Sequence, residues 1–234
     1  SKATAPTCCA PFSSAIAPST TARPAAGNLF ALPCACANIR RLSRRALART
    51  MAYVPQNSTV IFPFTVLDVV LMGRTAHLPT FAVPSAHDRR RAERALADLG
   101  IDHLATRPFQ CVSGGERQLA LIARALCQDA RILFMDEPTA SFDYGNQIRV
   151  LQIVNGLREA GFAVIMSAHN PDHAFISATH AAIINRGRVV AFGEPAATMT
   201  SQSLSELYGT PIHVSGDPPR PVTVCVPVVE SRRT

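Results

Sequence analysis

From about residue 39 onward the chain alternates short apolar runs with amphipathic segments, and this alternation constrains the fold more than any other feature. Runs of strand length lie at Met51–Val54, Ile132–Met135 and Ala163–Met166, and helical patterns separate them. Strands that alternate with helices predict an α/β fold with a mainly parallel sheet, which binds ligands at the carboxyl ends of its strands. The 234 residues are enough for one large domain or two small ones.

Capping patterns mark the ends of the expected helices. Ser43 precedes a short helical pattern, Thr65 and Asp68 have the spacing of a capping box, and Ser85 and Asp88 repeat it before a helix that Gly100 ends. Further helices are expected over 116–127, over 147–157, and after Asn170-Pro171, with Asn170 as the cap and Pro171 at the first position. Residues 185–188, between two apolar runs, predict a hairpin turn.

The net charge of +7 is unevenly distributed. The first 67 residues hold seven of the 23 basic residues and no acidic one, which leaves 16 against 16 in the remainder. A basic chain can signal a nucleic-acid partner, but here the excess belongs to one end. The apolar runs are far shorter than a membrane span, so no transmembrane helix is expected.

Residues 1–38 differ from the rest in composition and show neither a helical nor an alternating period. They contain four of the seven cysteines, at Cys8, Cys9, Cys34 and Cys36, without the partners that a zinc site needs. We interpret the segment as a disordered or misread N-terminus, with an organellar presequence as the alternative. The thiols after residue 38 fit a reduced, cytoplasmic protein.

The sharpest motif is Ser113-Gly114-Gly115-Glu116, directly before an amphipathic helix. Two glycines allow a ligand to approach the backbone closely, and a helix N-terminus offers free N–H groups and a positive dipole end. The Ser113 hydroxyl adds a donor, so the motif suits a phosphate. A Gly-Gly turn capped by serine is the simpler alternative.

A second group of polar residues follows the expected strands. Asp136 and Glu137 come after Ile132–Met135, which places Asp136 to hold Mg²⁺ and Glu137 to orient or deprotonate a water. His169 follows the next strand and could reach a γ-phosphate, although a single histidine is more often structural. Gln56 offers a neutral oxygen to a metal or water.

This ordered set resembles the ATP-binding cassette (ABC) family from about Leu42 onward. Gln56 matches its Q-loop, Ser113–Glu116 its signature, Ile132–Glu137 its Walker B strand, Asp143 its D-loop and His169 its switch histidine. The resemblance implies a P-loop NTPase-like cassette with a helical signature subdomain at about 65–128, inside a domain over 39–214 that precedes a tail over 215–234. Phe142 stands where the family usually has leucine.

Within the family, the segments Phe64–Arg74, Asp143–Gln147 and Tyr208–Pro211 look most like the ATPase subunits of importers for iron-siderophores, haem or cobalamin. The resemblance implies ATP and Mg²⁺ as cofactors, with Asp136 and Gln56 at the metal. It also implies catalysis by Glu137, His169 and Gln56, and an ATP contact in trans through Ser113–Glu116. Implied partners are a second cassette, membrane permease subunits and a substrate-binding protein, at the cytoplasmic face of the membrane.

The family's phosphate-binding loop, G-x-x-x-x-G-K-[ST] or Walker A, does not occur in this sequence, whose single lysine is Lys2. A frame change in the coding sequence, or a fragment beginning at Ser1, would explain the loss. We therefore expect an incomplete N-terminal part, impaired hydrolysis, and apolar sheet surface that the missing helix would otherwise cover. The aromatic that stacks on adenine in relatives has no counterpart.

Three other functions remain open. The chain could be a catalytically inactive or regulatory cassette, including the product of gene degradation, or a soluble cassette ATPase outside transport. Nucleic-acid binding through the arginines of residues 40–49 is a third possibility, which we do not favour because a charge run usually forms a solvated helix face.

Overall fold

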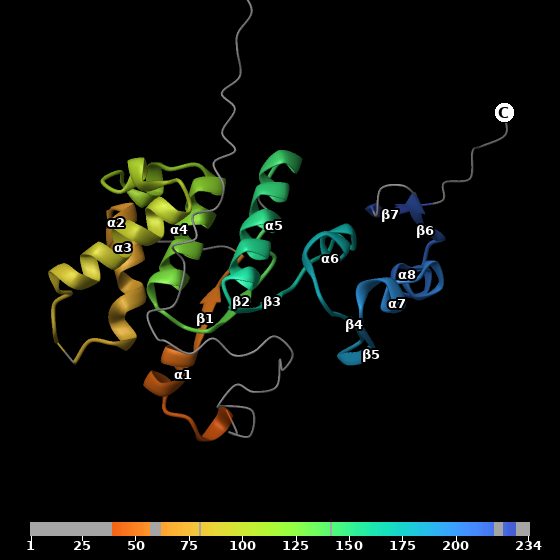
Figure 1. Cartoon of the computed structure of the whole chain (residues 1–234), viewed down its shortest axis with the longest axis horizontal. Helices are drawn as coiled ribbons and strands as arrows, with labels where there is room; N and C mark the ends of the chain where they lie inside the picture. Colours follow the sequence, from red (N-terminus) through yellow and green to blue (C-terminus); the bar gives the residue numbers. More distant parts are fainter. Residues whose placement is uncertain (1–38, 57–61, 80, 141, 218–221, 228–234) are drawn as a thin grey trace, which may run out of the picture.

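A computed structural model describes residues 39–56, 62–79, 81–140, 142–217 and 222–227 of the chain (Figure 1). The expectations for residues 1–38 lie outside this part. The helices are α1 (Arg44–Thr50), α2 (Val66–Leu71), α3 (Ala86–Asp98), α4 (Gly114–Cys127), α5 (Tyr144–Glu159), α6 (Asp172–Ser177), α7 (Pro195–Thr198) and α8 (Ser201–Tyr208). Short 3₁₀ segments are η1 (Ile39–Arg41), η2 (Met72–Ala76), η3 (Asp102–Leu104) and η4 (Phe109–Cys111). The strands are β1 (Met51–Val54), β2 (Ile132–Met135), β3 (Ala163–Met166), β4 (Ala181–Asn185), β5 (Arg188–Gly193), β6 (Ile212–Asp217) and β7 (Val222–Pro227).

The central sheet is parallel, with the order β1-β2-β3, as the alternation predicts. Val54 pairs with Met135, and Met135 pairs with Met166, so the three strands end at the same level. The residues that follow these strands therefore begin at one edge of the sheet.

Among the described residues, one face of this sheet is packed and the other is open. Ala52, Leu133 and Met135 are buried in the main core together with residues of α4 and α5. On the opposite face, Tyr53 and Ile165 are 56% and 53% exposed, and both are level with Phe134. Parallel sheets are normally covered on both faces, and among the described residues this row of side chains is left exposed; its link to a missing helix stays a prediction.

Helices α2, α3 and α4 pack together at one end of the molecule (Figure 1). Capping boxes begin all three, at Thr65, Ser85 and Ser113, as the sequence predicts for the first two. The described residues of the range 65–128, expected as a helical subdomain, contain helices and 3₁₀ turns and no named strand.

A buried ion pair joins η2 to α3 inside this helical group. Arg74 Nε lies 2.8 Å from Asp88 Oδ1, and the two side chains are 8% and 9% exposed. Arg74 also donates to the Cys127 carbonyl at the end of α4, at 3.1 Å. Hydrogen bonds from Ser85 and Arg74 hold the pKa of Asp88 far below its usual range, so this carboxylate is charged. Three helical segments thus meet at one guanidinium.

Helix α1 uses arginines to hold the neighbouring η2 segment. Arg45 donates to the carbonyls of Ala76 and Leu78, and Arg49 Nε donates to the Ala76 carbonyl at 3.1 Å. Part of the arginine-rich stretch is therefore occupied by contacts within the chain.

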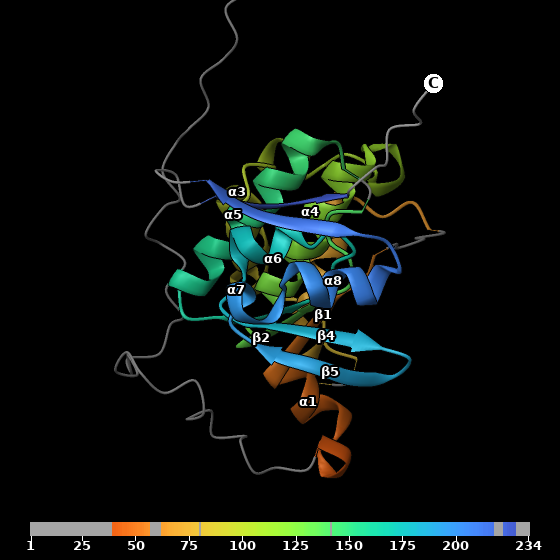
Figure 2. The same ribbon diagram turned by 90° about the vertical axis from the view of Figure 1, so that its right-hand side faces the viewer.

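The C-terminal part contains two antiparallel hairpins, β4–β5 and β6–β7 (Figure 2). The turn between β4 and β5 lies where it was predicted, with Arg186 and Gly187 at φ +49° and +75°. Residue 214, where the domain is expected to end, lies within β6, which pairs with β7; the domain boundary itself stays a prediction. A proline directly before β7, Pro221, and another as its last residue, Pro227, obscured this strand in the sequence.

Two predicted helix starts differ from those observed. Helix α5 begins at Tyr144 rather than near Gln147, because the Asp143 side chain accepts the Asn146 N–H and caps it. Helix α6 begins at Asp172, with Pro171 as the N-cap, while Asn170 Oδ1 accepts the Asp172 N–H at 3.0 Å. No helix in the described part of the chain is long and apolar enough to cross a membrane.

Candidate functional site

The carboxyl edge of the central sheet brings together the polar residues predicted from three separate motifs. Gln56 follows β1, Asp136 and Glu137 follow β2, and His169 lies beyond β3. Glu137 is the common partner: Gln56 Nε2 donates to its Oε2 at 2.8 Å, and His169 Nε2 lies 2.5 Å from its Oε1. The sequence predicted that these residues would share an edge, and the structure places Gln56 and His169 in contact with Glu137.

The backbone at Glu137 is unusual. Its φ of +43° lies in the left-handed region, which is uncommon for a residue with a side chain. The Glu137 N–H donates to Ser167 Oγ at 2.9 Å, and the same hydroxyl donates to Asp136 Oδ1 at 2.8 Å. Ser167 thus fixes both acidic residues, which ties the end of β2 to the end of β3.

Tyr53 is, after Ser167, a second hydrogen-bond partner of Asp136 that sequence reasoning missed. Its hydroxyl donates to Asp136 Oδ2 at 3.2 Å, from the open face of the sheet. Partial burial, with the bond to Asp136 and the charge of that residue, raises the pKa of Tyr53, so the hydroxyl keeps its proton as a donor. The sequence did hold a signal for both residues: Tyr53 lies in the strand before Gln56, and Ser167 directly follows β3, so each is near the predicted edge.

The oxygen donors at this edge suit Mg²⁺, which is bound by one or two carboxylates together with phosphates and waters. Asp136 supplies a carboxylate, and the Gln56 amide oxygen is available because its nitrogen bonds Glu137. The described residues contain no group of three or more His, Cys, Asp or Glu side chains that could hold a metal by themselves. Such a group is not required where phosphates complete the metal's coordination.

The Ser113–Glu116 motif forms the start of α4. Glu116 accepts the N–H and the hydroxyl of Ser113, both at 2.8 Å, and these bonds lower the pKa of Glu116. The Ser113 hydroxyl, expected as a phosphate donor, is therefore used within the cap. Apart from its chain neighbours and the backbone of α4 itself, no atom of the described residues lies within 4 Å of a Cβ built on Gly114, so the backbone there is open to a ligand.

Gly115 has the opposite environment, because a Cβ there would lie 2.7 Å from Cε1 of Phe142. The residue before the predicted D-loop aspartate thus packs against the signature glycine. A second link runs from Gln118 on α4, whose Nε2 donates to the Pro55 carbonyl beside Gln56, at 3.3 Å. In the described part of the chain no hydrogen bond or ion pair joins Ser113–Glu116 directly to the group around Glu137.

Comparison with known proteins assigns the chain to a family. The family described as "ABC transporter" matches residues 20–140, which is more than half of the chain. The chain belongs to the ABC transporter family. The match begins inside residues 1–38, which composition set apart, so the domain boundary at residue 39 stays a prediction.

The relatives are ATP-binding proteins of this family. An uncharacterized ABC transporter ATP-binding protein of Haemophilus influenzae is 43% identical over 164 residues, which are 70% of this chain and 62% of that protein. The hemin import ATP-binding protein HmuV of Nocardia farcinica is 38% identical over 78% of this chain and 62% of its own length. The chain thus spans less than two thirds of the length of either. Names of further relatives refer to import of molybdate and cobalamin and to transport of iron chelatin.

A solved structure supports the same assignment. An inward-facing ABC transporter assigned to the metal-chelate type superposes with a TM-score of 0.73 at 35% identity, over 77% of this chain and 73% of that one. The fold is therefore an ABC cassette with a parallel sheet, as predicted.

In this ABC cassette, Asp143 acts as a helix cap. Its Oδ1 accepts the Asn146 N–H and its Oδ2 accepts the Asn146 side-chain amide, each at 2.9 Å. Both oxygens are used within the first turn of α5. The D-loop role of Asp143 stays a prediction, as do the roles given to the other site residues.

His173 on α6 supports the segment that follows Glu137. It is 5% exposed, and its Nδ1 lies 3.3 Å from the Thr139 hydroxyl. Burial lowers the pKa of His173 from its ordinary 6.5, against an opposing effect of Asp172. At acidic pH the unfolded chain therefore binds this proton more readily than the folded chain. The free energy of unfolding decreases as the pH falls below about 6.5, by at most about 1.4 kcal/mol per pH unit.

We expect His173→Asn, which retains a polar atom near the position of Nδ1, to reduce this loss of stability between pH 7.5 and 5.5. Urea unfolding at both pH values measures the effect. Replacing the exposed His213 with asparagine is the control and should leave the pH dependence of the wild type unchanged. Equal pH dependence in the His173 variant and the wild type would contradict the assignment.

Proposed function

We propose that this chain is the ATP-binding subunit of an ABC importer, acting on iron-siderophores, haem or cobalamin, and that it binds ATP together with an intact cassette. The observation that carries the proposal is the contact of Glu137 with both Gln56 and His169 at the carboxyl edge of the sheet. The relatives named for hemin and cobalamin import and for iron chelatin transport support the substrate class.

The chemistry assigned to this edge is the hydrolysis of a phosphoanhydride. A carboxylate in contact with an imidazole and an amide is suited to orient a water and accept its proton, which is the part proposed for Glu137. Asp136 and the Gln56 amide oxygen would hold Mg²⁺, which neutralises phosphate charge when bound. Tyr53 and Ser167 hold the Asp136 carboxylate in place through hydrogen bonds to its two oxygens.

Because the sequence contains no Walker A loop, two copies of this chain would lack it at both ATP sites of a dimer. Paired with an intact cassette, the chain would instead present the N-terminus of α4 to ATP held by its partner. The open backbone at Gly114 supports this arrangement, since a phosphate can approach there without meeting a side chain.

The proposed permease contact lies on the helical group. An open groove of about 1030 Å³ runs along α2, η2 and the start of α3. Apolar side chains in its wall include Phe64, Leu71, Met72, Leu78, Phe81 and Val83. Arg45 and Asp68 add charge. An apolar groove with a few charges suits a short amphipathic helix of a membrane subunit, at the cytoplasmic face of the membrane.

The first experiment measures Mg-dependent ATP turnover by the pure full-length chain. We expect no turnover above that of Glu137→Gln, because no lysine and no glycine loop surround the phosphates. Robust turnover abolished by Glu137→Gln would overturn the proposed need for a second cassette. Co-purification with a permease separates an importer subunit from a soluble cassette ATPase.

The second experiment measures ATP-dependent pairing of the chain with an intact homologous cassette by sedimentation. We expect Gly114→Asp to weaken this pairing at least about tenfold more than the isosteric Gly114→Asn, since only aspartate places a charge against the phosphates. If ATP promotes no pairing at all, the chain is an inactive cassette and the proposed function fails.

A further inference from the structure

His169 lies in an irregular segment between β3 and α6, and its side chain is 87% exposed. In the described part of the chain, neither Ala168 nor His169 joins the backbone hydrogen bonding of these two elements. A residue so placed has many accessible orientations unless something else holds it. Its contact with Glu137 therefore requires a further restraint.

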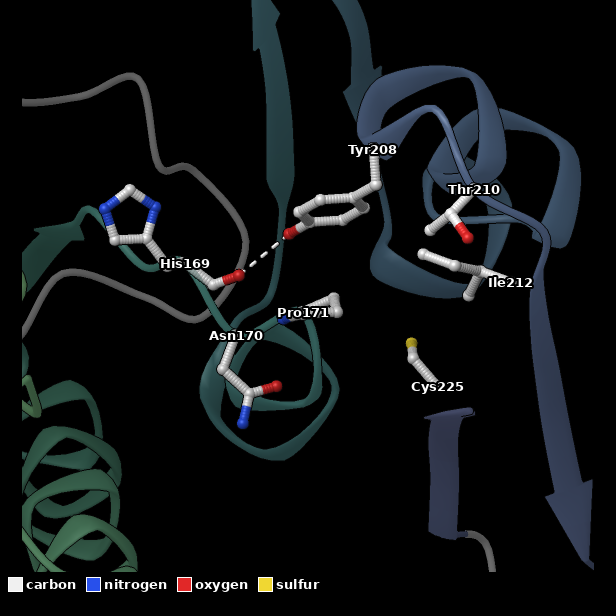
Figure 3. Close-up of a pocket in the computed structure, with 7 residues that line it drawn as sticks. All are labelled: His169, Asn170, Pro171, Tyr208, Thr210, Ile212 and Cys225. Atoms are coloured by element: carbon white, nitrogen blue, oxygen red, sulfur yellow. Dashed lines mark hydrogen bonds between the residues drawn. The ribbon is translucent and has the colours of Figure 1, made fainter. Parts of the chain in front are cut away.

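The restraint comes from the end of α8, 39 residues later in the sequence. The Tyr208 hydroxyl donates to the His169 carbonyl at 2.8 Å, and Figure 3 shows the phenol reaching across to that oxygen. Burial raises the pKa of Tyr208, so its hydroxyl keeps the proton that it donates. Gly209, at φ +67°, ends α8 directly after Tyr208, so the tyrosine is the last residue of the helix.

Further contacts around this hydrogen bond fix the C-terminal part relative to the segment that contains His169 and the start of α6. Tyr208, Pro171, Ile212 and Cys225 line a hollow of about 330 Å³ beside it (Figure 3). The Cys225 N–H on β7 donates to Asp172 Oδ1 at the start of α6, at 2.8 Å. The C-terminal part thus holds the chain on both sides of Asn170.

We propose that Tyr208 is a positioning residue that holds the backbone of His169 so that the imidazole Nε2 stays against the Glu137 carboxylate. The C-terminal helix α8 then controls a residue of the candidate site without touching the reacting atoms. The part of His169 and Glu137 in ATP hydrolysis rests on the proposed function, whereas the placement of the ring can be measured without nucleotide.

The test records the ring ¹⁵N and ¹H NMR signals of His169 in the full-length chain, assigned by their loss in His169→Gln. Glu137→Gln gives the reference position for a ring without its carboxylate partner. We expect Tyr208→Phe to move the His169 signals at least about half of the way to that reference. The double variant with both Tyr208→Phe and Glu137→Gln should show the same His169 signals as Glu137→Gln alone, because both changes remove the same contact.

Phenylalanine keeps the ring that lines the hollow, so the fold should survive, and unchanged signals of the buried His173 report this in the same spectrum. Tyr144→Phe is the matched control: it removes the hydroxyl of a tyrosine that is 76% exposed, and should move no signal of His169. The proposal is overturned if Tyr208→Phe leaves the His169 signals in place, or if Glu137→Gln itself moves nothing. Failure of ATP-dependent pairing would instead overturn the proposed function and leave this result intact.

Discussion

Replacing Arg74 with methionine should lower the free energy of unfolding by about 3–5 kcal/mol, because it leaves the Asp88 carboxylate charged and buried without its partner. Methionine keeps most of the length of the arginine stem, so lost packing contributes little. The variant also removes the hydrogen bond to the Cys127 carbonyl at the end of α4. Urea unfolding followed by circular dichroism measures the change.

Arg89, on the same helix as Asp88, provides the matched control. It forms an exposed ion pair with Glu93 at 3.0 Å, so Arg89→Met should cost less than about 0.5 kcal/mol. A double variant, Arg74→Met with Asp88→Asn, should recover part of the loss, since the amide carries no charge and can still accept from Ser85. Equal effects of the Arg74 and Arg89 variants would contradict a buried pair.

Gly73→Ala should destabilise the chain by about 3 kcal/mol, through overpacking where η2 crosses α4. A Cβ at this position would lie 2.2 Å from the Arg124 carbonyl oxygen and 3.2 Å from the Gln128 nitrogen. Both are backbone atoms of a helix or its cap, so neither can move aside as a side chain could. The two segments would have to separate, which also disturbs Arg74 next to it.

Gly114→Ala is the control for this substitution, because a methyl group there meets no described atom outside the backbone of its own helix and its chain neighbours within 4 Å. We expect its midpoint of urea unfolding to equal that of the wild type within error. A similar loss of stability in both variants would mean that the close approach of η2 to α4 does not determine the destabilisation by Gly73→Ala.

Local rules explain why much of the fold could be predicted. Side chains that bond their own backbone three residues away mark the starts of α2 and α3, and the apolar runs set the bounds of β1, β2 and β3. The shared edge of Gln56, Glu137 and His169 followed from a general property of parallel sheets, whereas their contact is a finding of the structure. That property needs the strand order but no knowledge of side-chain packing.

The missed contacts depend on register and on distant packing. Ser167 reaches Asp136 because β3 lies beside β2 in one particular register, and the Tyr208 hydroxyl reaches His169 only after α8 has packed. Gly115 was read as room for a ligand, whereas the ring of Phe142 occupies that space. No periodicity within one segment encodes such pairs.

The order of the central strands determines how the candidate site responds to partial opening. Among the described strands of this sheet, β2 alone is hydrogen-bonded on both sides, whereas β1 and β3 are edges. Fluctuations that detach an edge strand cost less than those that expose the centre. Asp136 and Glu137 therefore follow the most protected strand, while Gln56 and His169 follow strands that can fray first. The acidic pair should persist as a unit after its amide and imidazole partners have left.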